Sequence, residues 1–150
     1  MHPLLARRAE RRPIRVVLAE DNRLYAQALA LALDRDERLT IIGHAADGAE
    51  AVTLAGALHP DVVVMDLFMP VLDGFEATRR IRAEFPRTRV VVLTSSRELR
   101  ELEGARAAGA DAWVTKDAAS ADLSDLVHTI VRAAVRVRRE WALTPAAAAL

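Results

Sequence analysis

The sequence has no cysteine, a single lysine and no long apolar run. The absence of cysteine excludes disulfide bonds, thiolate zinc sites and a thiol nucleophile. Acidic and basic residues number 21 each, so the net charge is zero and gives no indication of a nucleic-acid partner. No segment reaches the length of a membrane span, and the arginine-rich start has no signal-peptide core. These absences favour a cytoplasmic protein that makes no use of the membrane.

The one lysine, Lys116, stands out because the other 20 basic residues are all arginines. We expect a chain with this bias to keep a lysine where a compact point charge is needed rather than a planar guanidinium group. The alternative is that a single lysine occurs by chance, and its position in the chain helps to decide between the two. Lys116 directly follows an apolar run, residues 112–115, that reads as a strand.

The most informative stretch is residues 61–74. Its apolar part, residues 62–65, predicts a strand that is buried on both faces of a sheet. Asp66 follows at the carboxyl end of that strand, where open α/β sheets bind ligands. Pro70 and the pair Asp73-Gly74 then predict a turn before a helical pattern begins. A lone aspartate here would be read as a strand end or a turn cap, so its role depends on the other strand ends.

The hydrophobic pattern predicts five strands that alternate with five helices. The strands are expected at 14–19, 39–45, 62–65, 89–93 and 112–115, and the helices at 23–35, 47–58, 74–84, 97–108 and 120–139. This alternation indicates an α/β fold with a parallel sheet wound on both faces, because right-handed crossovers place helices on each side. The chain is therefore expected to consist of a basic N-terminal arm (residues 1–13), one domain (residues 14–139) and a C-terminal tail or linker stub (residues 140–150).

The first predicted helix, residues 23–35, is apolar around more of its circumference than one buried stripe requires. Two interpretations are open. Either the surplus is alanine that is tolerated at the surface, or the helix has a second apolar surface that docks a partner.

Acidic and polar side chains follow the predicted strand ends, which share one edge of the sheet. They are Glu20 and Asp21 after the first strand, Asp66 after the third, Thr94 after the fourth and Lys116 after the fifth. Carboxylates in close contact repel one another and coexist most easily around a hard divalent cation such as Mg²⁺. Lys116 and Thr94 are suited to bind phosphoryl oxygens, and an aspartate can carry a phosphoryl group as an acyl phosphate. The constellation predicts a phospho-aspartate site.

Four motifs in this order resemble the receiver domain of bacterial two-component response regulators. They are Leu-Ala-Glu-Asp-Asn at 18–22, Asp-Leu-Phe-Met-Pro-Val-Leu-Asp-Gly at 66–74, Val-Val-Leu-Thr-Ser at 91–95 and Gly-Ala-Asp-Ala-Trp-Val-Thr-Lys at 109–116. The resemblance covers about residues 14–139. It implies a flavodoxin-like fold with strand order 2-1-3-4-5.

The resemblance also implies site roles. Asp66 would accept a phosphoryl group from a phosphohistidine of a sensor histidine kinase. Asp21, Asp66 and the backbone carbonyl of Phe68 would bind Mg²⁺, and Glu20 would assist directly or through water. The chain would then act in signal transduction that leads to transcriptional control.

A conformational switch is implied as well. Thr94 would move toward the phosphoryl group, Lys116 would pair with it, and Trp113 matches the aromatic side chain that follows this movement. The alternative for Trp113 is a half-buried strand aromatic. The family further suggests a homodimer through the region of the fourth and fifth helices or through the first helix.

Two features depart from the common pattern of the family. Asp117 follows Lys116 where many receivers have proline, although a subset of the NarL/LuxR type shares this feature. Residues 143–145, Leu-Thr-Pro, look like the start of a helix-turn-helix output domain, but no DNA-reading helix follows them in this sequence. DNA binding is therefore expected only through an output domain that this chain does not contain.

Two other functions remain open at this stage. A pseudo-receiver that works without phosphate is favoured only by Asp117 and Trp113. A Mg²⁺-dependent phosphohydrolase would use Asp66 as its nucleophile, but such enzymes of the haloacid-dehalogenase type place a second aspartate two residues later, and that position is Phe68.

Overall fold

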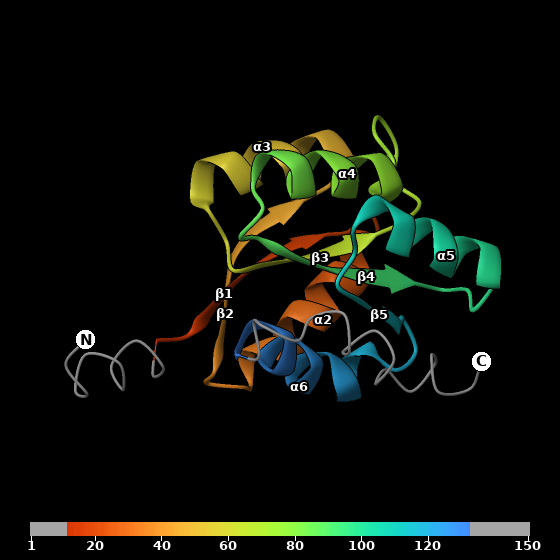
Figure 1. Cartoon of the computed structure of the whole chain (residues 1–150). Coiled ribbons are helices and arrows are strands. Elements are labelled where there is room, and N and C mark those ends of the chain that lie inside the picture. The colour runs from red at the N-terminus through yellow and green to blue at the C-terminus, as the bar shows by residue number, and fades with distance from the viewer. Residues whose placement is uncertain (1–11, 133–150) are drawn as a thin grey trace.

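The computed structural model describes residues 12–132, which form a parallel sheet with helices on both faces (Figure 1). The strands are β1 (Ile14–Ala19), β2 (Leu39–Ala45), β3 (Val62–Asp66), β4 (Arg89–Thr94) and β5 (Ala112–Thr115). The helices are α2 (Arg23–Asp34), α3 (Gly48–Leu58), α4 (Gly74–Glu84), α5 (Leu99–Ala108) and α6 (Ala119–Arg132). The five strands of this part of the chain have the order β2-β1-β3-β4-β5, which confirms the expected fold.

The predicted element bounds differ from the structure by a few residues. β3 and β4 each extend one residue further because Asp66 pairs with Leu93 and Thr94 pairs with Thr115. α5 begins two residues later than predicted, since Glu98 has extended backbone angles at its N-cap. The predicted helix end at 139, the tail 140–150 and most of the basic arm lie outside the described residues.

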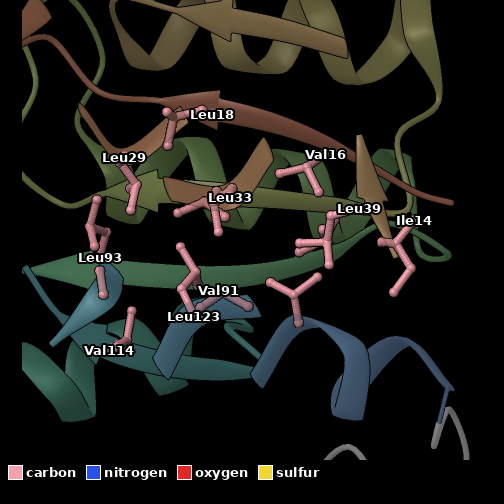
Figure 2. Close-up of a cluster of buried hydrophobic side chains, with 14 of the residues drawn as sticks. Ile14, Val16, Leu18, Leu29, Leu33, Leu39, Val91, Leu93, Val114 and Leu123 are labelled. Carbon is pink, nitrogen blue, oxygen red and sulfur yellow. The ribbon is translucent and has the colours of Figure 1, made fainter. Parts of the chain in front are cut away.

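The sheet separates two hydrophobic cores, because successive side chains of each strand point to opposite faces. α2 and α6 cover one face, and α3, α4 and α5 cover the other (Figure 1). Figure 2 shows the first core, in which Leu33 of α2 and Leu123 of α6 face Val91 of β4. Every residue of β3 is buried, as the apolar run predicted. None of the helices within residues 12–132 is both long enough and apolar enough to cross a bilayer.

Side-chain caps fix where three helices begin. The Asn22 side chain accepts a hydrogen bond from the Tyr25 N–H, and Asp47 and Asp73 cap α3 and α4 in the same way. Each cap of this kind contributes about 1 kcal/mol to stability. The cap at Asn22 matters most for the site, because it starts α2 directly after the acidic pair that ends β1.

The exposed surface of α2 contains leucine as well as alanine. Leu24 is 79% exposed and Leu31 is 67% exposed, whereas Leu29 and Leu33 are buried. The surplus apolar character of this helix is therefore more than surface alanine.

The loop after β3 is compact. The Leu72 N–H donates to the Pro70 carbonyl across Val71, which has a φ of 69°, a strained value for a β-branched residue. The Gly74 N–H donates to the Leu67 carbonyl, and a Cβ on Gly74 would lie 2.1 Å from the carbonyl oxygen of Asp66. Only glycine fits here, because α4 starts against the backbone of the strand end.

We therefore expect Gly74→Ala to lower the free energy of unfolding by about 2 kcal/mol or more, since the backbone of the strand end must move. Gly104→Ala in α5 is the matched control. Its Cβ would meet only the edge of the Phe75 ring at 3.0 Å, and alanine favours a helix interior, so its stability should stay within about 1 kcal/mol of the wild type. Urea denaturation measures both, and equal effects of the two changes would contradict this account of Gly74.

Candidate functional site

Three carboxylates meet at the carboxyl edge of the sheet. Glu20 and Asp21 follow β1, and Asp66 ends β3, which lies beside β1. One carboxylate oxygen from each of the three lies within 4.8 Å of the others. Glu20 is fully buried, Asp66 is 4% exposed and Asp21 is exposed. The structure thus brings together the three acids that the sequence placed at separate strand ends.

Lys116 supplies a positive charge to this acidic cluster. Its Nζ lies 3.0 Å from Glu20 Oε2 and 3.3 Å from Asp66 Oδ2. Its backbone N–H donates a 2.8 Å hydrogen bond to the Thr94 carbonyl, which holds the loop after β5 against β4. One ammonium group offsets only one of the three carboxylate charges, so the cluster keeps excess negative charge.

Burial and the charge of Glu20 raise the pKa of Asp66 to about 6, against the opposing effect of Lys116. Burial alone would lower the pKa of Lys116, but hydrogen bonds and charges from Glu20 and Asp66 outweigh burial and raise it. Lys116 is therefore an ammonium group at neutral pH, while Asp66 is mostly ionised but easily protonated.

The donor set of this cluster fits a hard divalent cation. Carboxylate oxygens from two strand ends lie within 4.8 Å of one another, and their charge is only partly offset by the lysine. Mg²⁺ prefers such ligands, with water completing its octahedron. The Phe68 N–H lies 3.4 Å from Asp66 Oδ1, which places the backbone of the predicted fourth ligand next to the site. The role of the Phe68 carbonyl stays a prediction.

Thr94 lies at the end of β4, between β3 and β5, and is fully buried. Its hydroxyl donates to the Ser96 carbonyl at 3.2 Å and accepts from the Ser96 N–H at 3.1 Å. The hydroxyl is thus bonded within its own loop, not to Asp66, and a role at the phosphoryl group requires that it rotate.

Trp113 lies on β5 and is 0% exposed, so the interpretation as a half-buried strand aromatic is wrong. Its indole packs in the core beneath α4 and α5 because position 113 points to that face of the sheet. Its role as a switch stays a prediction.

Asp117, the departure beside the lysine, is exposed. A hydrogen bond from the Thr115 side chain holds the pKa of Asp117 below its usual value. Lys116 pairs with Glu20 and Asp66 rather than with this neighbouring carboxylate. The exposed carboxylate of Asp117 therefore leaves both ion pairs of Lys116 with the site in place.

Tyr25 is the site residue that sequence reasoning missed, because its place in α2 read only as part of an apolar pattern. Its hydroxyl donates a 2.8 Å hydrogen bond to the Lys116 carbonyl, and the Lys116 Nζ lies 5.1 Å from the centre of its ring. The one available signal was its position in the first turn of the helix after the acidic pair, which points toward the same edge of the sheet.

Comparison with known proteins shows the same fold and family. The response regulator receiver domain family matches residues 16–128. The response regulator protein VraR of Staphylococcus epidermidis is 34% identical over 115 residues, which cover 77% of this chain and 55% of VraR. A protein-glutamate methylesterase/protein-glutamine glutaminase of Myxococcus xanthus is 40% identical over 139 residues, which cover 86% of this chain and 39% of that protein. The chain thus spans about half or less of the length of these curated relatives.

Solved structures agree with this match. The signal receiver domain of NarL from Mycobacterium tuberculosis has a TM-score of 0.77 and 28% identity, with 80% of this chain and 97% of that chain covered. A two-component response regulator of the LuxR family from Aurantimonas sp. SI85-9A1 has a TM-score of 0.77 and 30% identity, with 81% and 87% covered. Because the match extends over most of the chain, the protein belongs to the response regulator receiver domain family and resembles its NarL/LuxR type.

Proposed function

We propose that this chain is a phosphorylatable receiver in which Asp66 accepts a phosphoryl group from a phosphohistidine of a sensor histidine kinase. Asp21, Asp66 and the Phe68 carbonyl hold Mg²⁺, and Glu20 assists directly or through water. The observation that carries this proposal is the position of the Lys116 Nζ, 3.3 Å from Asp66 Oδ2, at the edge of a cluster of three carboxylates. A carboxylate that is to receive a dianionic group needs such a cation beside it.

The transfer forms a bond between an Asp66 carboxylate oxygen and phosphorus and breaks the bond between phosphorus and the donor imidazole nitrogen. The electron pair of the broken bond stays with the imidazole. Asp66 is mostly ionised at neutral pH, which its nucleophilic role requires. Bound Mg²⁺ would neutralise charge on the phosphoryl oxygens. Lys116 already faces Asp66, so it needs only a small movement to pair with the group after transfer.

The phosphorylated state then changes the surface that partners recognise. Thr94 rotates from its hydrogen bonds with Ser96 toward the phosphoryl group, and Trp113 responds on the neighbouring strand. We propose a cytoplasmic domain of residues 14–139 that regulates transcription, with DNA bound only through an output domain outside these residues. A homodimer would form through the region of α5 and α6 or through α2, whose exposed Leu24 supports the latter.

Phosphorylation tests the proposal directly. With a small phosphodonor and Mg²⁺, we expect the wild type to gain one phosphoryl group that hydroxylamine removes, as measured by intact mass. Asp66→Asn should abolish the gain, since the amide is not a nucleophile. Asp34→Asn, an exposed change at the far end of α2, is the matched control and should behave as the wild type.

A pseudo-receiver makes the opposite prediction. If the folded wild type takes up neither phosphate nor a beryllofluoride mimic, the proposed function is wrong. Equal phosphate uptake by Asp66→Asn would place the acceptor elsewhere.

Magnesium binding should depend on the acidic cluster and on pH. We expect Asp21→Asn to weaken the affinity for Mg²⁺ roughly tenfold, because one charged ligand is lost. Affinity should also be lower at pH 5 than at pH 7.5, because Asp66, with a pKa of about 6, is then protonated. Calorimetric titration measures both effects, with Asp34→Asn as control, and an affinity indifferent to Asp21 would refute the site.

The cluster should also reduce stability when no cation is present. The pKa of Asp66 is raised from 3.8 to about 6, so its ionisation disfavours the folded state as pH rises through that interval. One pKa unit corresponds to about 1.4 kcal/mol, and loss of the Lys116 contact offsets part of the gain. Without Mg²⁺ at pH 7.5, the free energy of unfolding of Asp66→Asn should therefore be about 1 to 2 kcal/mol higher than that of the wild type.

Denaturation at several pH values provides the check on this prediction. The gain should shrink as pH falls from 6 to 3.8 and vanish by about pH 3, where Asp66 is protonated in both the folded and the unfolded state, and it should also shrink in excess Mg²⁺. If Asp66→Asn is less stable than the wild type at pH 7.5 without Mg²⁺, repulsion between Asp66 and its acidic neighbours does not destabilise the fold, and the prediction is wrong.

A further inference from the structure

Lys116 follows β5, whereas Asp66 ends β3, and β4 lies between them. Neighbouring strands are about 4.8 Å apart, so the lysine must reach across roughly 10 Å of sheet. A side chain with four rotatable bonds does not hold such an extended position without contacts along its length. The question is which residue supplies them.

The Lys116 backbone is held on both sides. Its N–H donates to the Thr94 carbonyl at 2.8 Å, and its carbonyl accepts from the Tyr25 hydroxyl at 2.8 Å. The second bond joins the first turn of α2 to a loop 91 residues away in the sequence. The Tyr25 ring also lies beneath the ammonium group, with Nζ 5.1 Å from its centre, where the face of the ring attracts a cation.

Tyr25 is itself anchored to the acidic cluster, so the contacts form a closed ring of four residues. The Tyr25 N–H donates to Asn22 Oδ1, and the Asn22 N–H donates to Glu20 Oε1, each at 3.1 Å. The Lys116 Nζ donates to that same Glu20 Oε1 at 3.1 Å, and the Tyr25 hydroxyl completes the ring at the Lys116 carbonyl. The start of α2 and the lysine are thereby fixed to one carboxylate.

The state of the phenol agrees with this arrangement. Burial and the charges of Glu20, Asp66 and Asp117 raise the pKa of Tyr25 to about 12, so its hydroxyl keeps the proton that it donates. Tyr25 also packs against the core under α2, which by itself would be satisfied by phenylalanine or leucine.

We propose that Tyr25 is a positioning residue for Lys116. The Tyr25 hydroxyl fixes the backbone of the lysine, and the Tyr25 ring holds the ammonium group between Glu20 and Asp66. The effect of Tyr25 on phosphoryl transfer rests on the proposed function. Its effect on the position of the lysine is independent of that function, because this position can be measured without any phosphodonor.

The single lysine makes the test unusually direct. In protein labelled with ¹³C-lysine, all side-chain lysine signals come from Lys116. The wild type should show the Lys116 ε-methylene protons shifted upfield by the Tyr25 ring. Tyr25→Phe should keep most of that shift, and Tyr25→Leu should lose it. Phe85→Leu, which removes a ring in edge-on contact with His59, is the control and should leave the lysine signals unchanged.

Phosphorylation rates with a small phosphodonor form the second arm of the test. We expect Tyr25→Phe to slow the reaction about threefold to fivefold through the lost hydrogen bond, and Tyr25→Leu to slow it at least about tenfold. Phe85→Leu should react like the wild type. A smaller effect of Tyr25→Phe than of Tyr25→Leu separates the contribution of the hydroxyl from that of the ring. The amide spectrum of each variant shows whether it is folded.

Unchanged lysine signals in a folded Tyr25→Leu would overturn the proposal, even if the rate fell, because the residue would then act only through stability. Unchanged rates in both Tyr25 variants would also overturn its role in transfer. If the lysine signals respond as expected but the wild type takes up no phosphate, the positioning is upheld and the proposed function fails instead.

Discussion

Repulsion among Glu20, Asp21 and Asp66 is the constraint on which the rest of the structure depends. The strand order puts the ends of β1 and β3 side by side, so their acids cannot avoid one another. Lys116 offsets part of this charge, and a divalent cation is the simplest complement for the remainder. The excess negative charge suits the site to a cation, and under the proposed function that cation would help it to accept a phosphoryl group.

The surrounding fold holds these charges in place with short, specific devices. The Asn22 cap begins α2 beside Glu20, and the compact loop at Val71 and Gly74 returns the chain against the end of β3. The cap stabilises the helix start, whereas the loop holds its position at the cost of backbone strain at Val71. This pattern is common at functional sites, where stability is given up for function. Under the proposed function, adding or removing one phosphoryl group would change the largest charges of this site.

Much of this arrangement follows from the sequence, for identifiable reasons. Apolar runs such as residues 62–65 act locally, so the strands were predictable. The meeting of Asp66 with Lys116 was predictable for another reason, because the carboxyl ends of parallel strands share one edge of the sheet. Contacts that depend on rotamers and depth were not. The full burial of Trp113 depends on helices packed above it, and the bond from Tyr25 to Lys116 joins residues far apart in the chain. A pattern of apolar residues cannot show that a phenol in it also serves a site.

We propose that Asp66 and its acidic neighbours form one site for a cation and a phosphoryl group. A crystal structure grown with Mg²⁺ and beryllofluoride is the decisive measurement. We expect Mg²⁺ bound by Asp21, Asp66 and the Phe68 carbonyl, with beryllofluoride on Asp66 in contact with Lys116. Beryllofluoride on any other carboxylate, or Mg²⁺ bound away from these residues, would contradict it.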